Sequence, residues 1–510
     1  MTSRFLPPIL LLAAAQGCGA TTDCERRDPY PALLTGAETL TQRAGSLSFV
    51  ARDNNTLTAT TYRATGFDEA TGPIVFVLHG ARRDAQAYLA AIAPYAERAG
   101  ALAIAPEFPE RLYPNSEDYT LGLGVNGPPS GGTYDAGEWR PESDTTFMEL
   151  EHLFEAIKGA LPGAASRCDY LVFGHSAGAQ FTHRLLLFHP TARVRRAVAA
   201  NAGWYTLPVS SAGDPNTEMP YGLTGSPVGG RDVTQALSRE LIVLLGQADT
   251  ATADEDPDLR GTDEAQAQGT NRLERGRHFM ATVEGLGEPH RWTQSEVPGA
   301  AHNVTQMAGS AAWWLFRPDG ATPWQPSAAA EGAGIVFNEV LADPPNDAPG
   351  DANGDGARDN LQDELVELVN TGDSAVCLAG WGLGDAEDSF RHRFPVGTTL
   401  GPGEALVVFG GGVPTGPFGG VTVQIADFDG SLNLQNAGDV LRLSTPDGET
   451  ILALSWGDCA ESACASDHLS DDLERDAAIT RSPEITGAWV THGGAGYSPG
   501  TAADGGALVE

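Results

Sequence analysis

The chain has 510 residues, too many for one ordinary domain, and 41% of them are apolar, which excludes a disordered protein. Its formal net charge of −36 argues against nucleic acid and anionic membrane surfaces as partners. No stretch of the sequence is long and apolar enough to cross a membrane.

Residues 1–20 have the pattern of an export signal. Arg4 precedes an apolar core over residues 5–15, and small residues follow. Cys18 stands at a lipoprotein-type cleavage site, although Gln16 is bulkier than such sites usually carry. We expect an exported protein: either an outer-membrane or cell-surface lipoprotein acylated at Cys18, or a freely secreted one. Any membrane contact would be through that lipid.

Export places the cysteines in an oxidising compartment, where disulfides persist. Six are present: Cys18, Cys24, Cys168, Cys377, Cys459 and Cys464. Cys459 and Cys464 are close enough in sequence to staple a loop. If the first cysteine carries lipid, Cys24 pairs with Cys168 and Cys377 remains a buried thiol. No Cys/His cluster has the spacing of a zinc site.

Short apolar runs alternate with amphipathic segments between residues 45 and 315. The runs predict buried strands at Ile74–Leu78, Ala101–Ala105, Tyr170–Phe173, Val194–Ala200 and Leu241–Leu245. Helical periodicity separates them, over 147–161 and over 85–92, where the helix should end or kink near Pro94. This alternation predicts the α/β class, with a doubly wound, mostly parallel sheet covered on both faces. Ligands of such sheets bind beyond the carboxyl ends of the strands.

The candidate nucleophile is Ser176. It stands in the stretch Gly174-His-Ser-Ala-Gly178, which follows an apolar run and precedes a helical period ended by Pro190. A serine at such a strand–turn–helix corner is lifted clear of the sheet, and the two glycines permit a backbone too tight for a Cβ.

A serine needs a histidine to take its proton and an acid to orient that histidine. In doubly wound hydrolases the order along the chain is serine, acid, histidine. Asp249 comes directly after the strand at 241–245, and His302 comes in the loop after an expected strand at Arg291–Val297. The alternatives to these two residues are Asp254 and Asp256 for the acid, and His278 and His290 for the base.

Stabilisation of an oxyanion requires two backbone donors. One is the N–H of Ala177, directly after the nucleophile. The other comes from the loop that follows the strand at 74–78, where either Ala81 or Arg82 presents its N–H. His79 and His175 flank these donors, and we interpret both as structural.

Residues 45–315 resemble the α/β-hydrolases, in particular secreted esterases similar to polyhydroxybutyrate depolymerases and feruloyl esterases. The matching segments are Val77–Gly80, Gly174–Ala179, Gly246–Asp249, His302 and Ala200–Tyr205. The resemblance implies hydrolysis of an ester, polymeric or small, through an acyl-enzyme and without a catalytic cofactor. Trp204 and Tyr205 open a long loop over 204–232, and we expect them to form a wall of the substrate pocket.

The composition changes beyond residue 316. Residues 317–334 contain three prolines and an alanine run and form the expected linker. Residues 335–510 carry strand-like runs separated by turns, without a helical period, which predicts an all-β immunoglobulin-like sandwich. The runs are Val336–Leu341, Leu365–Val369, Ala405–Phe409, Val440–Leu443 and Ile451–Trp456. This region resembles a lamin-tail-like domain at Phe337–Val340, Glu364–Asn370, Gly380–Trp381, Pro402–Glu404 and Ser498–Thr501, and the resemblance implies binding or scaffolding.

An acidic loop in this second region has the spacing of a calcium loop. Oxygen ligands recur at positions 1, 3, 5 and 9 with glycine at position 6. The candidate ligands are Asp351, Asn353, Asp355, the carbonyl of Ala357, and Asp359. Position 12 is Gln362, so a bidentate ligand would come from Asp363 or Glu364. The alternative is a solvated acidic turn.

Taken in chain order, we predict an export signal over 1–20, a hydrolase domain over 21–316, the linker and the sandwich. The function we expect is an exported serine esterase. Two alternatives stay open: a catalytically inert surface scaffold or adhesion protein, and an exported serine peptidase on the same fold.

Overall fold

The computed structural model describes residues 34–508, apart from 52–54, 114–115, 123–144, 231–232, 298, 318–333, 379, 386–390, 396–397, 427–430, 446–448, 458–463, 471–472, 474–475 and 494–495. The export signal, Cys18 and most of the expected linker lie outside these residues. Within them, no helix combines the length and the apolar character needed to span a bilayer.

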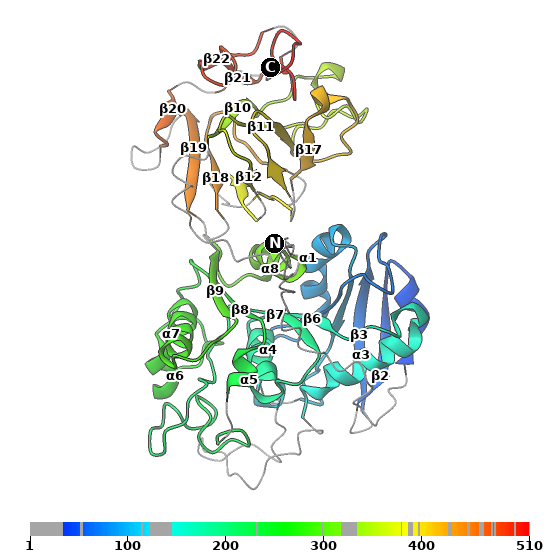
Figure 1. The fold of residues 1–510 in the computed structure, drawn as a ribbon, viewed down its shortest axis with the longest axis vertical. Helices are drawn as coiled ribbons and strands as arrows, with labels where there is room; N and C mark the ends of the chain where they lie inside the picture. Colours follow the sequence, from blue (N-terminus) through cyan, green and yellow to red (C-terminus); the bar gives the residue numbers. More distant parts are fainter. Residues whose placement is uncertain are drawn as a thin grey trace, which may run out of the picture.

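A nine-stranded sheet forms the centre of the first domain, in the order β1-β2-β3-β5-β4-β6-β7-β8-β9 (Figure 1). Its strands are β1 (Leu34–Thr35), β2 (Ala44–Val50), β3 (Thr56–Arg63), β4 (Ile74–Leu78), β5 (Leu102–Pro106), β6 (Tyr170–His175), β7 (Val194–Ala200), β8 (Leu241–Gly246) and β9 (Trp292–Val297). The strands from β5 to β9 in this order pair in parallel, whereas β1, β2 and β3 are antiparallel. The predicted α/β class is confirmed.

Helices cover both faces of this sheet. They are α1 (Ala85–Arg98), α2 (Ser116–Thr120), α3 (Met148–Ala160), α4 (Ala177–Phe188), α5 (Thr234–Leu237), α6 (Asp263–Gln268), α7 (Arg272–Gly285) and α8 (Val304–Phe316). Alternate strand residues point to opposite faces. Val75 and Val77 therefore share a core with α1 and α8, while Phe76 and Leu78 share one with α3, α4 and α7.

Of the two outcomes predicted for the first helix near Pro94, an end or a kink, the end is wrong. Helix α1 continues through Pro94 to Arg98. A proline inside a helix removes the hydrogen bond to the carbonyl four residues earlier. Here both Pro94 and Ala90 are exposed, so water can solvate that carbonyl.

The second domain is all-β. A six-stranded sheet has the order β17-β16-β11-β10-β21-β22, a five-stranded sheet has the order β14-β13-β18-β19-β20, and β12 pairs with β15. The strands are β10 (Ile335–Leu341), β11 (Leu365–Asn370), β12 (Val376–Cys377), β13 (Gly382–Gly384), β14 (His392–Arg393), β15 (Thr399–Leu400), β16 (Ala405–Phe409), β17 (Thr422–Ile425), β18 (Gly438–Ser444), β19 (Thr450–Gly457), β20 (Asp467–Leu469), β21 (Ile479–Ser482) and β22 (Ala488–Thr491). Phe337 and Val366 from one sheet share a core with Leu441 and Trp456 from the other, as in a sandwich.

The second domain lies against α1 and α8 (Figure 1). Trp313 on α8 packs on Gly380, where a Cβ would lie 2.6 Å from the indole. Arg393 donates a 2.6 Å hydrogen bond to the Ser310 hydroxyl, also on α8. The two domains therefore share a packed contact on one helix.

The cysteines differ in state. Cys168 and Cys464 are both disulfide-bonded, and their predicted partners Cys24 and Cys459 lie outside the described residues. Cys377 is free, as expected, but it is exposed rather than buried. It ends the two-residue strand β12, in which Val376 packs against the sandwich core and the next side chain, that of Cys377, points outward.

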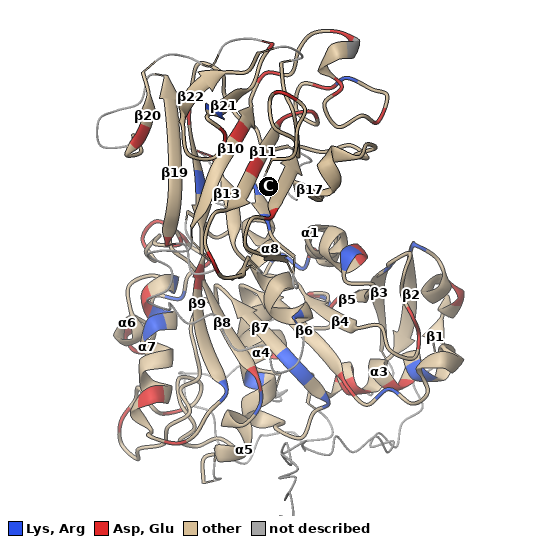
Figure 2. Cartoon of the chain, turned by 45° about the horizontal axis from the view of Figure 1, so that its top comes forward, with Lys and Arg blue, Asp and Glu red and all other residues tan. Residues whose placement is uncertain are grey.

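Buried carboxylates tie the C-terminal loop to the six-stranded sheet, and Figure 2 shows acidic positions on β10 and β11. Glu339 accepts the N–H of Ser498 at 2.8 Å, and Glu367 accepts the N–H of Gly500 at 2.7 Å. Burial, with the neighbouring Glu367, raises the pKa of Glu339 to about 8. Burial raises the pKa of Glu367 to about 7.

The second domain should therefore lose stability as the pH rises. The folded pKa values of Glu339 and Glu367 lie above the ordinary value of 4.5, so their contribution is complete below pH 4.5 and is lost as the pH rises through 7 to 8. Hydrogen exchange of the β10 and β11 amides should show opening that is easier at pH 9 than at pH 5, after correction for intrinsic rates. Glu339→Gln should flatten this dependence and Glu449→Gln, at an exposed position, should not; equal profiles for the two variants would contradict the assignment.

Candidate active site

Ser176 occupies a strained corner between β6 and α4. Its φ of 59° and ψ of −118° lie where L-residues are rarely found. The two flanking glycines make this corner feasible, because a Cβ on Gly174 would lie 2.2 Å from the carbonyl oxygen of Gly178, and a Cβ on Gly178 would lie 2.2 Å from that of Leu78. The local sequence thus forces the serine hydroxyl out of the sheet.

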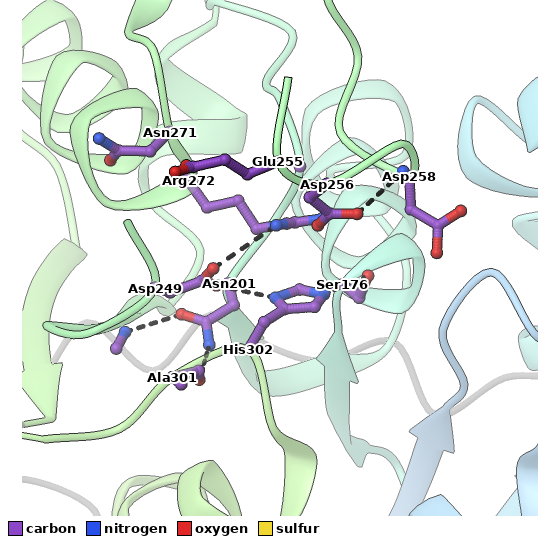
Figure 3. Close-up of polar contacts among 12 residues, drawn as sticks. Ser176, Asn201, Asp249, Glu255, Asp256, Asp258, Asn271, Arg272, Ala301 and His302 are labelled. Carbon is purple, nitrogen blue, oxygen red and sulfur yellow. Dashed lines mark hydrogen bonds and ion pairs between the residues drawn. The ribbon is translucent and has the colours of Figure 1, made fainter. Parts of the chain in front are cut away.

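The structure brings Ser176, His302 and Asp249 together in a hydrogen-bonded row (Figure 3). His302 Nε2 lies 3.0 Å from Ser176 Oγ, and His302 Nδ1 lies 2.7 Å from Asp249 Oδ2. Asp249 follows β8 and is 2% exposed, whereas His302 lies in the loop between β9 and α8. A carboxylate on Nδ1 fixes the tautomer in which Nε2 accepts the serine proton.

The alternative acids and bases have other surroundings. Asp256 pairs with Arg272 rather than with a histidine, at 2.7 Å. Asp254 is exposed, and so is His278. His290 contacts the carbonyl of Trp292.

Two further residues position the row, and the sequence analysis did not single them out. Arg272, at the start of α7, lies 3.5 Å from Asp249 Oδ1 and also pairs with Asp256 (Figure 3). Asn201, with a φ of 52°, accepts the N–H of Gly246 and donates to the carbonyl of Ala301. Asn201 thus ties the ends of β7 and β8 to the His302 loop. The sequence signal that could have identified Asn201 is its position directly after the apolar strand β7.

His175 lies beside the row of Ser176, His302 and Asp249. It is fully buried, and its ring centroid lies 4.8 Å from that of His302. Burial, with His302 and Arg272 nearby, holds the pKa of His175 well below its ordinary value. The neutral ring of His175 therefore adds no positive charge beside His302.

Ser176 faces a cavity of about 560 Å³, and the residues predicted to supply oxyanion donors, Ala81, Arg82 and Ala177, also line it. Trp204 also lines the cavity, and the guanidinium groups of Arg184 and Arg260 lie 4.0 and 4.6 Å from its ring centroid. The expectation for Tyr205 is wrong. Its ring is fully buried and stacks on Phe279 at 4.5 Å, because adjacent residues of this loop point in opposite directions.

The acidic loop of the second domain is folded by its own side chains. Asp363, predicted as a metal ligand, instead accepts the N–H groups of Asn353 and Asp359 at 3.0 and 2.7 Å. Glu364 accepts the N–H of Leu434 and points away from the loop. In favour of a cation, Asp351 Oδ1 is buried without a hydrogen-bond partner. Among the described residues, no group of three or more His, Cys, Asp or Glu side chains is arranged to hold a metal.

Comparisons with known proteins cover both domains. Residues 328–458 match the model of the Lamin Tail Domain family. Poly(aspartic acid) hydrolase-1 from Sphingomonas sp. KT-1 is 34% identical over 54% of this chain and 98% of its own, with a TM-score of 0.47. A poly(3-hydroxybutyrate) depolymerase from Bordetella parapertussis is 29% identical over 56% of this chain and 95% of its own, with a TM-score of 0.48. No curated protein matches the chain.

Proposed function

We propose that this chain, which belongs to the α/β-hydrolases of the polyhydroxybutyrate depolymerase type and carries a lamin tail domain, is an exported serine hydrolase of carboxylic esters. The observation that carries the proposal is the row from Ser176 Oγ to His302 Nε2 to Asp249, at 3.0 and 2.7 Å. This row opens on a cavity of about 560 Å³ that admits a substrate to the hydroxyl.

The chemistry follows from the positions of these groups. His302 Nε2 takes the proton of Ser176 as Oγ attacks the ester carbonyl, and Asp249 stabilises the imidazolium that forms. Backbone N–H groups beside the nucleophile hold the oxyanion. His302 then protonates the leaving alkoxide and, in the second half of the reaction, activates the water that releases the acid. These steps use groups of the chain alone.

Turnover of p-nitrophenyl acetate and butyrate tests the proposal. The purified chain should hydrolyse both, and Ser176→Ala should lose about a thousandfold or more in kcat, because it lacks the nucleophile. A fluorophosphonate should label the wild-type protein at Ser176 and leave the variant unlabelled. A folded wild-type chain with neither turnover nor labelling would favour an inert surface scaffold.

A second candidate is amide hydrolysis at the same site. The observation that favours it is the 34% identity to a protein named as a poly(aspartic acid) hydrolase, because poly(aspartic acid) is joined by amide bonds. Matched p-nitrophenyl ester and p-nitroanilide substrates with the same acyl group separate the two candidates. Faster acylation by the anilide than by the ester would favour the amidase.

Export and lipidation at Cys18 belong to the same proposal. Mass spectrometry of the mature protein distinguishes a chain that begins at acylated Cys18 from one cleaved without lipid. A chain that retains residues 1–20 would contradict export.

We also infer that the loop of Asp351, Asn353, Asp355, the Ala357 carbonyl and Asp359 binds calcium, because Asp351 Oδ1 is a buried acceptor without a hydrogen-bond partner. Millimolar Ca²⁺ should raise the Tm of the full chain relative to EGTA, since a ligand that binds only the folded state stabilises it. Asp351→Asn should remove this shift and Asp343→Asn, outside the loop, should keep it. An unchanged wild-type Tm would favour the solvated turn.

A further inference from the structure

The peptide between Gly80 and Ala81 is held at its carbonyl. The Gly80 oxygen lies 2.9 Å from His79 Nδ1 and accepts the N–H of Arg83 at 3.2 Å. His79 is fully buried directly after β4, and the Tyr119 hydroxyl donates to its carbonyl at 2.9 Å. The side chain of His79 therefore folds back on the peptide that follows it.

A second contact of His79 fixes which nitrogen carries the proton. The backbone N–H of Phe108 donates to His79 Nε2 at 3.0 Å, so Nε2 is unprotonated. The proton is then on Nδ1, which donates it to the Gly80 carbonyl. Burial lowers the pKa of His79 to about 4, which keeps this neutral form at neutral pH.

The other side of Gly80 is contacted by Tyr88 on α1. The Tyr88 hydroxyl approaches the Gly80 Cα closely, and that hydroxyl lies 3.3 Å from His175 Nδ1. A Cβ on Gly80 would lie 2.3 Å from the Tyr88 oxygen, so the approach requires glycine. Tyr88 thus connects the loop after β4 to the residue before the nucleophile.

The orientation of the next N–H follows from peptide geometry. In a planar trans peptide, C=O and N–H point in opposite directions. With the Gly80 carbonyl turned toward His79, the Ala81 N–H points away from it, and Ala81 lines the cavity that holds Ser176. In the described part of the chain, the N–H groups of Ala81, Arg82 and Ala177 donate to no backbone carbonyl of a turn or loop. The orientation set by the Gly80 carbonyl is therefore what favours Ala81 over Arg82.

We propose that His79, which holds the Gly80 carbonyl, and Tyr88, which contacts Gly80 at its Cα, are positioning residues of this loop, so that Ala81 rather than Arg82 supplies the second oxyanion donor. This inference rests on the proposed serine hydrolase function. The donor meets a full negative charge only in the transition state, so a misplaced peptide should lower kcat and leave KM unchanged.

Two substitutions of His79 separate positioning from packing. The side-chain nitrogen of His79→Asn can stand where Nδ1 stands and donate to Gly80. His79→Gln is also a polar amide, but its terminal group reaches the Nε2 position and not the Nδ1 position. We expect kcat for p-nitrophenyl butyrate to fall about a hundredfold in His79→Gln and less than about tenfold in His79→Asn, with KM unchanged in both.

Affinity for phenylboronic acid, which forms a tetrahedral adduct with a nucleophilic serine, should fall with kcat across the same variants. Tyr88→Phe keeps the ring, loses the hydroxyl that contacts Gly80 and lies beside His175, and should lower kcat about tenfold; it tests the inference even if the His79 variants do not fold. If the wild-type chain hydrolyses esters and the folded variants keep its kcat and boronate affinity, the positioning inference is overturned and the proposed function stands. A wild-type chain that neither turns over esters nor reacts with fluorophosphonate would overturn the proposed function as well.

Discussion

Asp249→Asn should lower kcat on p-nitrophenyl butyrate about ten-thousandfold while leaving the fold intact. Asp249 Oδ2 lies 2.7 Å from His302 Nδ1, and only a carboxylate requires the proton to be on that nitrogen. An asparagine can present its N–H₂ group instead, which selects the tautomer with the proton on Nε2. His302 could then no longer accept the proton of Ser176, 3.0 Å away. Steady-state kinetics of the purified variant measure the loss.

Asp256→Asn is the matched control for this prediction. Asp256 lies on the same segment after β8 and was an alternative acid, but its carboxylate contacts Arg272 at 2.7 Å and not His302. Removing its charge should cost far less activity, because Arg272 keeps its second contact, to Asp249. If Asp256→Asn were the more damaging change, Asp256 would be the acid and the row drawn in Figure 3 would be misassigned.

The first domain was predictable because its signals are local. Each buried strand is an apolar run, and β4 and β7 have the residues that the sequence predicts. Ser176, Asp249 and His302 each follow a strand, and parallel strands bring their carboxyl ends to one edge of the sheet. The topology alone therefore places the three side chains near one another.

The sequence did not predict contacts between side chains that are far apart along the chain. Arg272 begins a helix, and its contact with Asp249 depends on where α7 is placed against β8. From the sequence His79 was interpreted only as structural. Its contacts with Gly80 and with Phe108, 29 residues away, are visible only in the structure. Trp204 and Tyr205 are adjacent aromatic residues that the sequence does not distinguish. Their side chains point in different directions from the backbone, so Trp204 lines the cavity and Tyr205 lies in the core.

The predicted calcium loop shows a similar limit in the second domain. The spacing of Asp351, Asn353 and Asp355 fits a cation, but Asp363 binds two backbone N–H groups of the loop itself. An aspartate that accepts backbone hydrogen bonds within a loop and an aspartate that binds a metal look the same in the sequence. The two roles differ in whether a carboxylate oxygen still has a lone pair that accepts no hydrogen bond. The buried Oδ1 of Asp351 is such an oxygen.

Glu240→Gln should destabilise the hydrolase domain by about 3–5 kcal/mol, because this carboxylate neutralises buried guanidinium groups at the opposite ends of the strands. Its Oε1 contacts Arg196 and, at 2.7 Å, Arg317, while Oε2 contacts Arg291 at 2.6 Å. Arg291 is 63% exposed and can turn into water, but the side chains of Arg196 and Arg317 are only 2% and 6% exposed.

Without the carboxylate, two buried positive charges face each other, and Arg196 also holds the carbonyls of Leu315 and Arg317 at the end of α8. Urea denaturation followed by circular dichroism measures the loss, with Glu284→Gln on α7 as a control. The residual folded protein should keep its kcat, because Glu240 precedes β8 whereas Asp249 follows it. A loss below about 1 kcal/mol, the range of exposed ion pairs, would mean that the guanidinium groups reach solvent and that the end of α8 is held by its apolar contacts alone.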